Sequence, residues 1–168
     1  MKIRSPQQLL VHELQAIQDA EKQASQALQK IQKEVENTQL RKMIEQRMKQ
    51  GERVLQDVQK GLEKLNGKSN GVQNVAARGL IQESEKPLKE IQDPEMKQAA
   101  VIAGAQKLEH YCIAAWGTVK AMASECGEKE LAQSMERALK EGYEWDQKMT
   151  ELAESRINPA ALEQRPQA

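Results

Sequence analysis

The chain has few aromatic residues, few cysteines and no excess of either charge. Phe is absent, and Phe, Trp and Tyr together make up 2% of the 168 residues. Ala, Leu, Lys, Glu and Gln dominate instead, and these residues favour helices over strands. A chain of this length fits one domain with a substantial core. The composition therefore predicts an all-α fold.

The other scarcities exclude several function classes. Two cysteines, Cys112 and Cys126, do not make a disulfide scaffold. Lys+Arg and Asp+Glu number 25 each, so no net charge attracts nucleic acid or anionic membrane. No stretch approaches the roughly 20 apolar residues of a membrane span, and the first residues lack an apolar signal core. We expect a cytoplasmic protein that binds neither nucleic acid nor membrane.

Apolar residues recur at helical spacing in four long segments, each with a start or stop signal. Ser5-Pro6 and Asp93-Pro94 pair a capping residue with a proline suited to the first helical turn. The expected helices cover 5–36, 37–65, 93–125 and 128–158, with a weaker, shorter helix within 72–91. We expect one domain over 1–158 and a frayed tail over 159–168 after Asn158-Pro159.

The lengths of the connections predict how these helices pack. Short links join the first two helices and the last two, which gives two antiparallel hairpins. The link between the hairpins is long and carries the short extra helix. Two hairpins joined by a crossover form the ferritin-like four-helix bundle. The apolar seam expected on the second helix is Ile44, Met48, Gly51, Leu55, Val58, Leu62 and Leu65.

Two glutamates interrupt the apolar seams of this bundle. Glu21 lies near the middle of the first helix and Glu109 near the middle of the third, and both take positions where leucine would be expected. The facing positions of the other two helices are Gly51 and Gly142. A buried carboxylate needs a partner or a proton. Two alternatives follow: the glutamates are ligands of a metal centre, or they pair with a long basic side chain or share a proton.

A dimetal carboxylate bundle needs one Glu from each of two helices and a Glu-x-x-His pair from each of the others. The chain contains no Glu-x-x-His. The substitutes are Glu141 and Glu144 on the fourth helix and Glu52 on the second, which is one residue off the seam. His110 follows Glu109 directly, so it points about 100° away on the helix, to the rim of the bundle.

Several segments resemble the YciE/YciF family of bacterial ferritin-like stress proteins, in the same order along nearly the whole chain. They are Ala20-Glu21-Lys22-Gln23, Gly79-Leu80-Ile81-Gln82-Glu83, Gln106-Lys107-Leu108-Glu109-His110-Tyr111 and Ala114-Ala115-Trp116-Gly117-Thr118. The resemblance implies a rubrerythrin-like bundle with a short extra helix, a di-iron centre and a link to stress responses.

The chain also departs from the family pattern. Glu21 and Glu109 match family acidic positions, but Gln50, Cys112 and Gly142 stand where the family has acidic residues. Glu109 and Cys112 lie one turn apart, so they could hold a single zinc or iron together with Glu21 and a water. Alternatively, Cys112 is a small buried apolar residue.

Two functions follow for this chain. The first is a stress-response protein with a degenerate carboxylate site that binds little or no iron or manganese. The second is a metal-dependent, ferroxidase-like oxidoreductase with a non-standard ligand set drawn from Glu21, Glu52, Glu109, Cys112, Glu141 and Glu144. We also expect a homodimer formed through an exposed apolar flank such as Leu9, Val11 or Val54.

Overall fold

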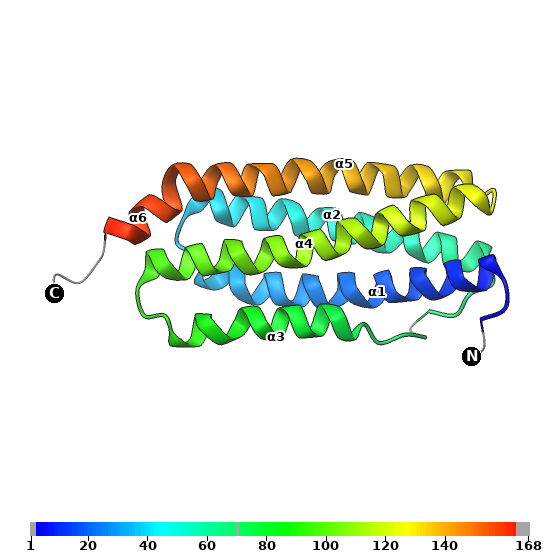
Figure 1. The fold of residues 1–168 in the computed structure, drawn as a ribbon, viewed down its shortest axis with the longest axis horizontal. Coiled ribbons are helices and arrows are strands. Elements are labelled where there is room, and N and C mark those ends of the chain that lie inside the picture. Colours follow the sequence, from blue (N-terminus) through cyan, green and yellow to red (C-terminus); the bar gives the residue numbers. More distant parts are fainter. Residues whose placement is uncertain (1–2, 70, 164–168) are drawn as a thin grey trace.

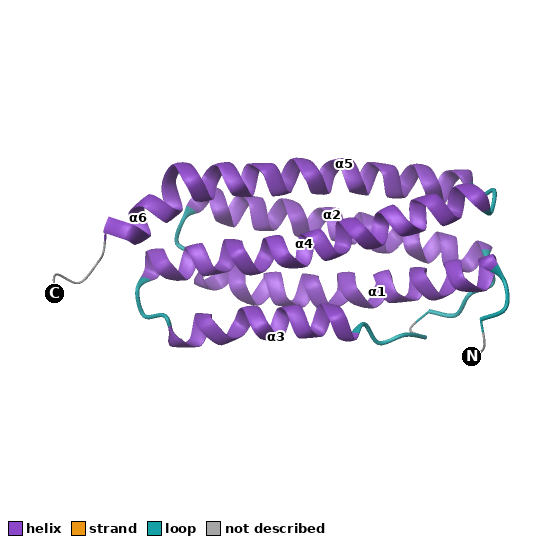
Figure 2. Ribbon diagram, in the orientation of Figure 1, coloured by secondary structure: helices purple, strands orange, loops and turns teal. Residues whose placement is uncertain are grey.

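The computed structural model describes residues 3–69 and 71–163, and these residues contain helices and no strands (Figures 1 and 2). Four long helices lie along one axis and form an elongated bundle. They are α1 Pro6–Ile31, α2 Thr38–Lys64, α4 Pro94–Glu125 and α5 Lys129–Leu152. The shorter α3, Val75–Glu90, lies in the crossover and packs on α1 and α4. The predicted arrangement of two antiparallel hairpins joined by a crossover helix is confirmed.

Capping side chains begin the helices where the sequence predicted them. Ser5 Oγ accepts a hydrogen bond from the backbone N–H of Gln8 at 3.2 Å. Asn37 Oδ1 accepts from two N–H groups at the start of α2, and Asp93 Oδ1 accepts from Met96 N–H at 2.8 Å. These bonds satisfy donors that have no partner within the helix. The links between α1 and α2 and between α4 and α5 are short, so the helices of each hairpin run antiparallel.

The buried Asn74 fixes the crossover to the bundle. Its side-chain amide donates to the carbonyl oxygen of Ala16 at 2.9 Å and to the hydroxyl of Tyr111 at 2.6 Å. Its Oδ1 accepts from Ala77 N–H and caps α3, while its own backbone N–H donates to Asp19. One side chain thus joins the start of α3 to both α1 and α4.

Most of the core lies in two large apolar clusters separated along the bundle axis, and a smaller third cluster lies beneath α3. One of the large clusters contains Leu14, Val58 and Trp116, and the other contains Leu28, Ile44 and Met149. Between them lies a layer of buried polar side chains. The predicted layer position is therefore correct: glutamates of α1 and α4 meet glycines of α2 and α5 at the middle of the bundle.

The C-terminal end differs from the expectation that the last helix stops at Asn158-Pro159. After α5 the chain makes a π-helical turn, Ala153–Ile157, and continues as α6, Asn158–Glu163. Pro159 follows directly on the π-helical turn, where Asn158 N–H donates to the carbonyl oxygen of Ala153 and the α-helical hydrogen-bond pattern is already interrupted. The rest of the expected tail, residues 164–168, lies outside the described residues.

Candidate functional site

An arginine occupies the middle of the polar layer. Arg47, on α2, is 3% exposed and lies between Glu21 of α1 and Glu109 of α4. Its Nη1 and Nη2 donate to the two carboxylate oxygens of Glu21 at 3.1 and 3.2 Å. Its Nε donates to Glu109 Oε2. Of the two alternatives for the glutamates, pairing with a long basic side chain is the one that the structure shows.

The arginine also lies over an aromatic ring. Its guanidinium carbon is 5.3 Å from the centroid of the Trp116 indole, a fully buried ring of α4. A cation over the face of an indole is attracted by the ring quadrupole. The planar guanidinium is suited to this place, because it can bond two carboxylates in its plane and stack on a ring with its face. Lysine could not make the same set of contacts.

The two glycines of the layer make room for the charged side chains. A Cβ at Gly51 would lie 3.0 Å from Glu21 Oε2 and 3.1 Å from Arg47 Nη1. A Cβ at Gly142 would lie 2.7 Å from a ring carbon of Trp116 and 2.9 Å from Glu109 Oε1. The positions that face the glutamates therefore hold no carboxylate, and they cannot take even a methyl group without a shift of the layer.

The electrostatics of the layer follow from its burial. Burial alone would lower the pKa of Arg47, but Glu21 and Glu109 outweigh it and raise that pKa well above its ordinary value. Burial raises the pKa of Glu109, and Arg47 opposes the rise only in part. Glu109 Oε1 and Trp116 Nε1 have no hydrogen-bond partner among the described residues. The layer thus holds two carboxyl groups around one permanent cation.

The remaining predicted ligands lie in different surroundings. Cys112 is buried close to the layer, and burial, followed by the charge of Glu21, raises the pKa of its thiol well above the ordinary value. Its sulfur therefore stays a neutral thiol, which is a poor metal ligand. Glu52 and Glu144 are exposed. Glu141 pairs with Arg53 at 2.7 Å on the surface. The structure does not bring these three glutamates into the layer.

The metal that the family resemblance implies does not fit these residues. The carboxylates of Glu21 and Glu109 already bond the guanidinium that lies between them. No group of three or more His, Cys, Asp or Glu side chains is placed to hold a metal ion within residues 3–69 and 71–163. His110 is at the rim, as predicted, with its Nε2 3.2 Å from Asp146 Oδ2.

The sequence did not reveal Arg47 because two of the inward positions expected on α2, Met48 and Leu55, lie one residue too far along. The expected seam contained Met48 and Leu55, whereas the structure buries Arg47 and Val54 more deeply. Both versions share Ile44, Gly51 and Val58, so the apolar pattern alone did not separate them. A basic residue one turn before Gly51, at the height of two buried acids, was the available signal.

The fold and the layer define a class: an all-helical bundle of two hairpins with an arginine bridging two carboxylates at its centre. The profile of the domain of unknown function DUF892 matches residues 5–162. Protein YciF of Escherichia coli strain K12 is 30% identical over 162 residues, which cover 96% of this chain and 98% of YciF. The chain therefore belongs to the DUF892 family, which includes YciF.

Solved structures agree with this assignment. The structure of the E. coli stress protein YciF superimposes with a TM-score of 0.85 at 30% identity, over 93% of this chain and 99% of that one. YcfI of Rhodopseudomonas palustris, provisionally described as a structural protein, gives a TM-score of 0.83 at 31% identity, over 89% and 95% of the two chains. A protein of Xanthomonas campestris pv. campestris gives 0.76 at 25% identity, over 95% and 97%.

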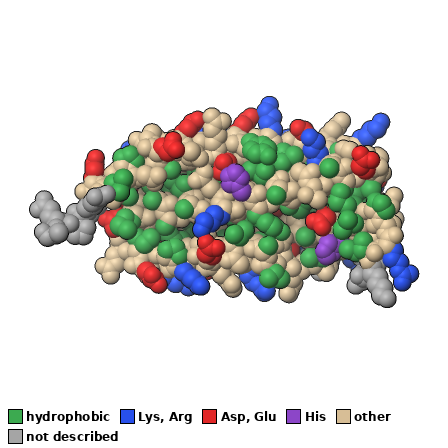
Figure 3. Space-filling view, viewed as in Figure 1, with side chains coloured by type: hydrophobic (Ala, Val, Ile, Leu, Met, Phe, Trp, Pro, Cys, Tyr) green, Lys and Arg blue, Asp and Glu red, His purple; other side chains and the backbone are tan. Residues whose placement is uncertain are grey.

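The surface adds two observations. None of the helices within 3–69 and 71–163 combines the length and the apolar character needed to cross a membrane. On the face that Figure 3 shows, acidic and basic side chains are interspersed, and no large area carries one sign of charge.

Proposed function

We propose that this chain is a YciF-type stress-response protein whose central layer holds an internal cation, Arg47, in place of a metal. The single observation that carries the proposal is the guanidinium of Arg47 bonded to both Glu21 and Glu109. Buried carboxylates require a counter-charge. A metal ion is one source of that charge, and a permanently protonated arginine is another. On this reading the protein acts as a structural or partner-binding bundle.

The space and the number of anionic ligands available to a metal ion in the layer both support the proposal. A metal ion at this height would have to displace a guanidinium held by three hydrogen bonds and an indole face. It would then find two carboxylates and no further anionic ligand, because Gly51 and Gly142 occupy the facing positions. Hard cations such as Mn²⁺ and Fe²⁺ bind poorly where so few oxygens compensate for lost water.

Metal loading tests this proposal. Protein purified without chelator and incubated with Fe²⁺ or Mn²⁺ should retain less than about 0.2 metal per chain, and its Tm should change by less than about 1 °C, because a ligand bound only by the native state must stabilise it. The matched variant is Arg47→Ala, which frees both carboxylates and should retain more metal than the natural protein. A stoichiometric metal content in the natural protein, with a Tm that rises by several degrees and falls with chelator, would instead support the metal-dependent oxidoreductase.

We further propose a homodimer, as the sequence predicted, although not through the flank first expected. Val11 and Val54 are 9% and 3% exposed and belong to the core, so of the three residues only Leu9, at 38%, lies on the surface. Other large apolar residues are more exposed, among them Tyr143 of α5 at 57%. Light scattering on the purified protein measures the mass directly, and a monomer at micromolar concentration would refute the dimer.

A further inference from the structure

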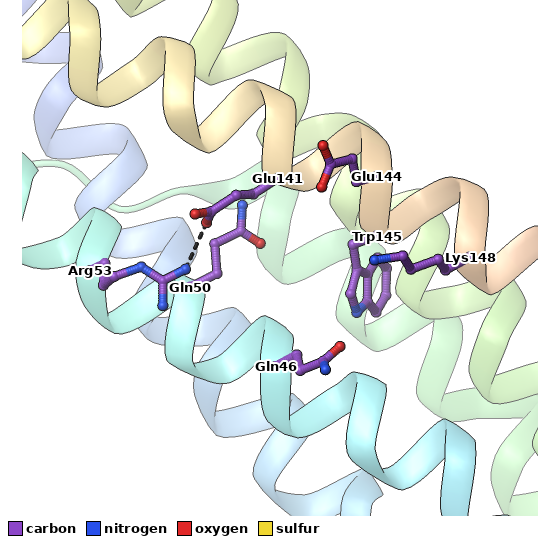
Figure 4. Close-up of a pocket in the computed structure, with 7 residues that line it drawn as sticks. All are labelled: Gln46, Gln50, Arg53, Glu141, Glu144, Trp145 and Lys148. Carbon is purple, nitrogen blue, oxygen red and sulfur yellow. Dashed lines mark hydrogen bonds and ion pairs between the residues drawn. The ribbon is translucent and has the colours of Figure 1, made fainter.

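A polar cavity opens between α2 and α5, and none of the ion-pair residues Glu21, Arg47 and Glu109 lines it. We name it the α2–α5 groove (Figure 4), and its lining residues are Gln46, Gln50, Arg53, Glu141, Glu144, Trp145 and Lys148. Its volume is about 140 Å³. The three residues of α2 are spaced by four and three positions, and the four of α5 by three, one and three. Each set therefore forms one continuous helix face, and the two faces meet at the groove.

Two side chains at the base of the groove are held rigidly. Gln50 is 3% exposed, and its Nε2 donates to the carbonyl oxygen of Ala138 on α5 at 3.0 Å. The indole Nε1 of Trp145 donates to the carbonyl oxygen of Met43 on α2 at 2.8 Å. Each bond crosses from one helix to the other, so the two helices and both side chains are fixed relative to each other. Gln50 Oε1 has no donor among the described residues.

Two acidic and two basic side chains line the groove, and one of each forms an ion pair. Arg53 and Glu141 form an ion pair at 2.7 Å. Glu144 and Lys148 are exposed, and neither forms an ion pair with another described residue. In Figure 4 both side chains come from α5: Lys148 extends toward the Trp145 indole, and Glu144 lies farther along the helix. The groove therefore offers one free anion and one free cation.

A ligand that carries both charges matches this arrangement. An ammonium group can bond the Glu144 carboxylate and the free oxygen of Gln50, while a carboxylate can bond Lys148 and the amide of Gln46. A purely anionic or purely cationic ligand would satisfy one side and leave the other unmatched. The volume is close to that of an engineered protein cavity that holds benzene, so a ligand of about six non-hydrogen atoms fits.

We propose that the α2–α5 groove binds a small zwitterion, of the class of a free α-amino acid the size of alanine or serine. A ligand of about six atoms in an open groove is expected to bind with a Kd on the order of 1 mM. The proposal uses none of the residues Glu21, Arg47 and Glu109, so its test is independent of whether Arg47 replaces a metal in the layer. The competing arrangement is a direct Glu144–Lys148 pair along the exposed helix, four positions apart, which would close the groove.

The test follows the indole N–H resonance of Trp145 and the side-chain amide resonances of Gln46 and Gln50 by NMR during a titration with L-alanine. Saturable shifts of all three are expected by about 20 mM, given the Kd estimated above. Glu144→Gln and Lys148→Met should each weaken binding at least about tenfold, because each removes one charged partner. The control variants are Glu130→Gln and Lys140→Met, which change the same residue types on exposed positions of α5 outside the groove, and they should bind as the natural protein does.

Single-charge probes decide the ligand class. Acetate and methylammonium each carry one half of the zwitterion, and each should bind at least about tenfold more weakly than alanine. The proposal is overturned if alanine causes no saturable shift, if Glu144→Gln and Lys148→Met leave its affinity unchanged, or if acetate binds as tightly as alanine. The last result would identify a plain anion site at Lys148 and Arg53.

Discussion

Removing the charge of Arg47 should destabilise the fold more than any substitution of a surface arginine. Arg47→Met keeps an unbranched side chain of similar reach but leaves Glu21 and Glu109 buried without a counter-charge. Breaking a buried ion pair by removing one partner costs about 3–5 kcal/mol. For a chain of this size about 1 kcal/mol corresponds to roughly 2–4 °C, so Tm should fall by about 6–20 °C.

The measurement is urea unfolding followed by the helical circular dichroism signal, at neutral pH and without metal. The control is Arg53→Met on the same helix, where the arginine is 51% exposed and pairs with Glu141. Exposed pairs contribute about 0–1 kcal/mol, so this control should unfold close to the natural protein. If Arg47→Met unfolds within about 1 kcal/mol of the natural protein, the layer is not held by its ion pairs and the reasoning is refuted.

Replacing Glu21, Arg47 and Glu109 together tests whether the charged layer stabilises the fold or only fixes how the helices align. Glu21→Leu with Glu109→Leu alone leaves the Arg47 cation unpaired and should be strongly destabilising. The triple variant that adds Arg47→Met removes every buried charge of the layer, and such replacements are often neutral or stabilising by about 1–4 kcal/mol. A triple variant less stable than the double would contradict this account, since it would show that the charges are not the source of the cost.

Two further predictions concern the glycines and the pH dependence of the layer. Gly142→Ala should lower the free energy of unfolding by about 1–3 kcal/mol, because the added Cβ would overlap Trp116 and Glu109. The control Gly79→Ala on α3, whose Cβ would meet nothing within 4 Å, should raise that free energy by about 0.5–1 kcal/mol. Equal effects of the two substitutions in urea unfolding would contradict the crowding at Gly142. Because burial raises the pKa of Glu109 in the fold, the folded chain binds more protons than the unfolded chain above the ordinary glutamate pKa. The contribution of Glu109 to the free energy of unfolding therefore falls as pH rises from the ordinary glutamate pKa to the raised pKa of Glu109, by at most about 1.4 kcal/mol per pH unit. Glu109→Gln should remove this pH dependence of the free energy of unfolding. An unchanged pH dependence in that variant would assign it to other groups.

The overall fold could be predicted from the sequence because its signals are local. The capping residues Ser5, Asn37 and Asp93 mark helix starts, and short links force antiparallel hairpins. The height of the layer also followed, since Glu21 and Glu109 lie at helix midpoints. The end of the last helix did not follow, because Pro159 resembles a stop signal and its place in the first turn of a new helix depends on the preceding π-helical turn.

The content of the layer could not be predicted in the same way. The expected and observed seams of α2 share Ile44, Gly51 and Val58 and differ by one residue at two positions, which is a partial rotation of the inward face. That rotation exchanges Arg47 for Met48, and the apolar members that both versions share, Ile44 and Val58, cannot correct it. The choice is settled by tertiary electrostatics: two buried carboxylates at one height require a cation, and only the true rotation of α2 brings one there.

The layer also indicates where activity should be sought under the proposed function. An arginine is permanently charged, does not exchange with solvent ions and has no accessible second oxidation state, so a layer neutralised by Arg47 can fix the register of the helices but carries no electron transfer. Glu21 and Glu109 are then structural, and their conservative replacement should alter unfolding and leave surface binding intact. Recognition should then be sought on the outside of the bundle, where the α2–α5 groove combines rigid anchors at Gln50 and Trp145 with two charged groups that have no ion-pair partner within residues 3–69 and 71–163.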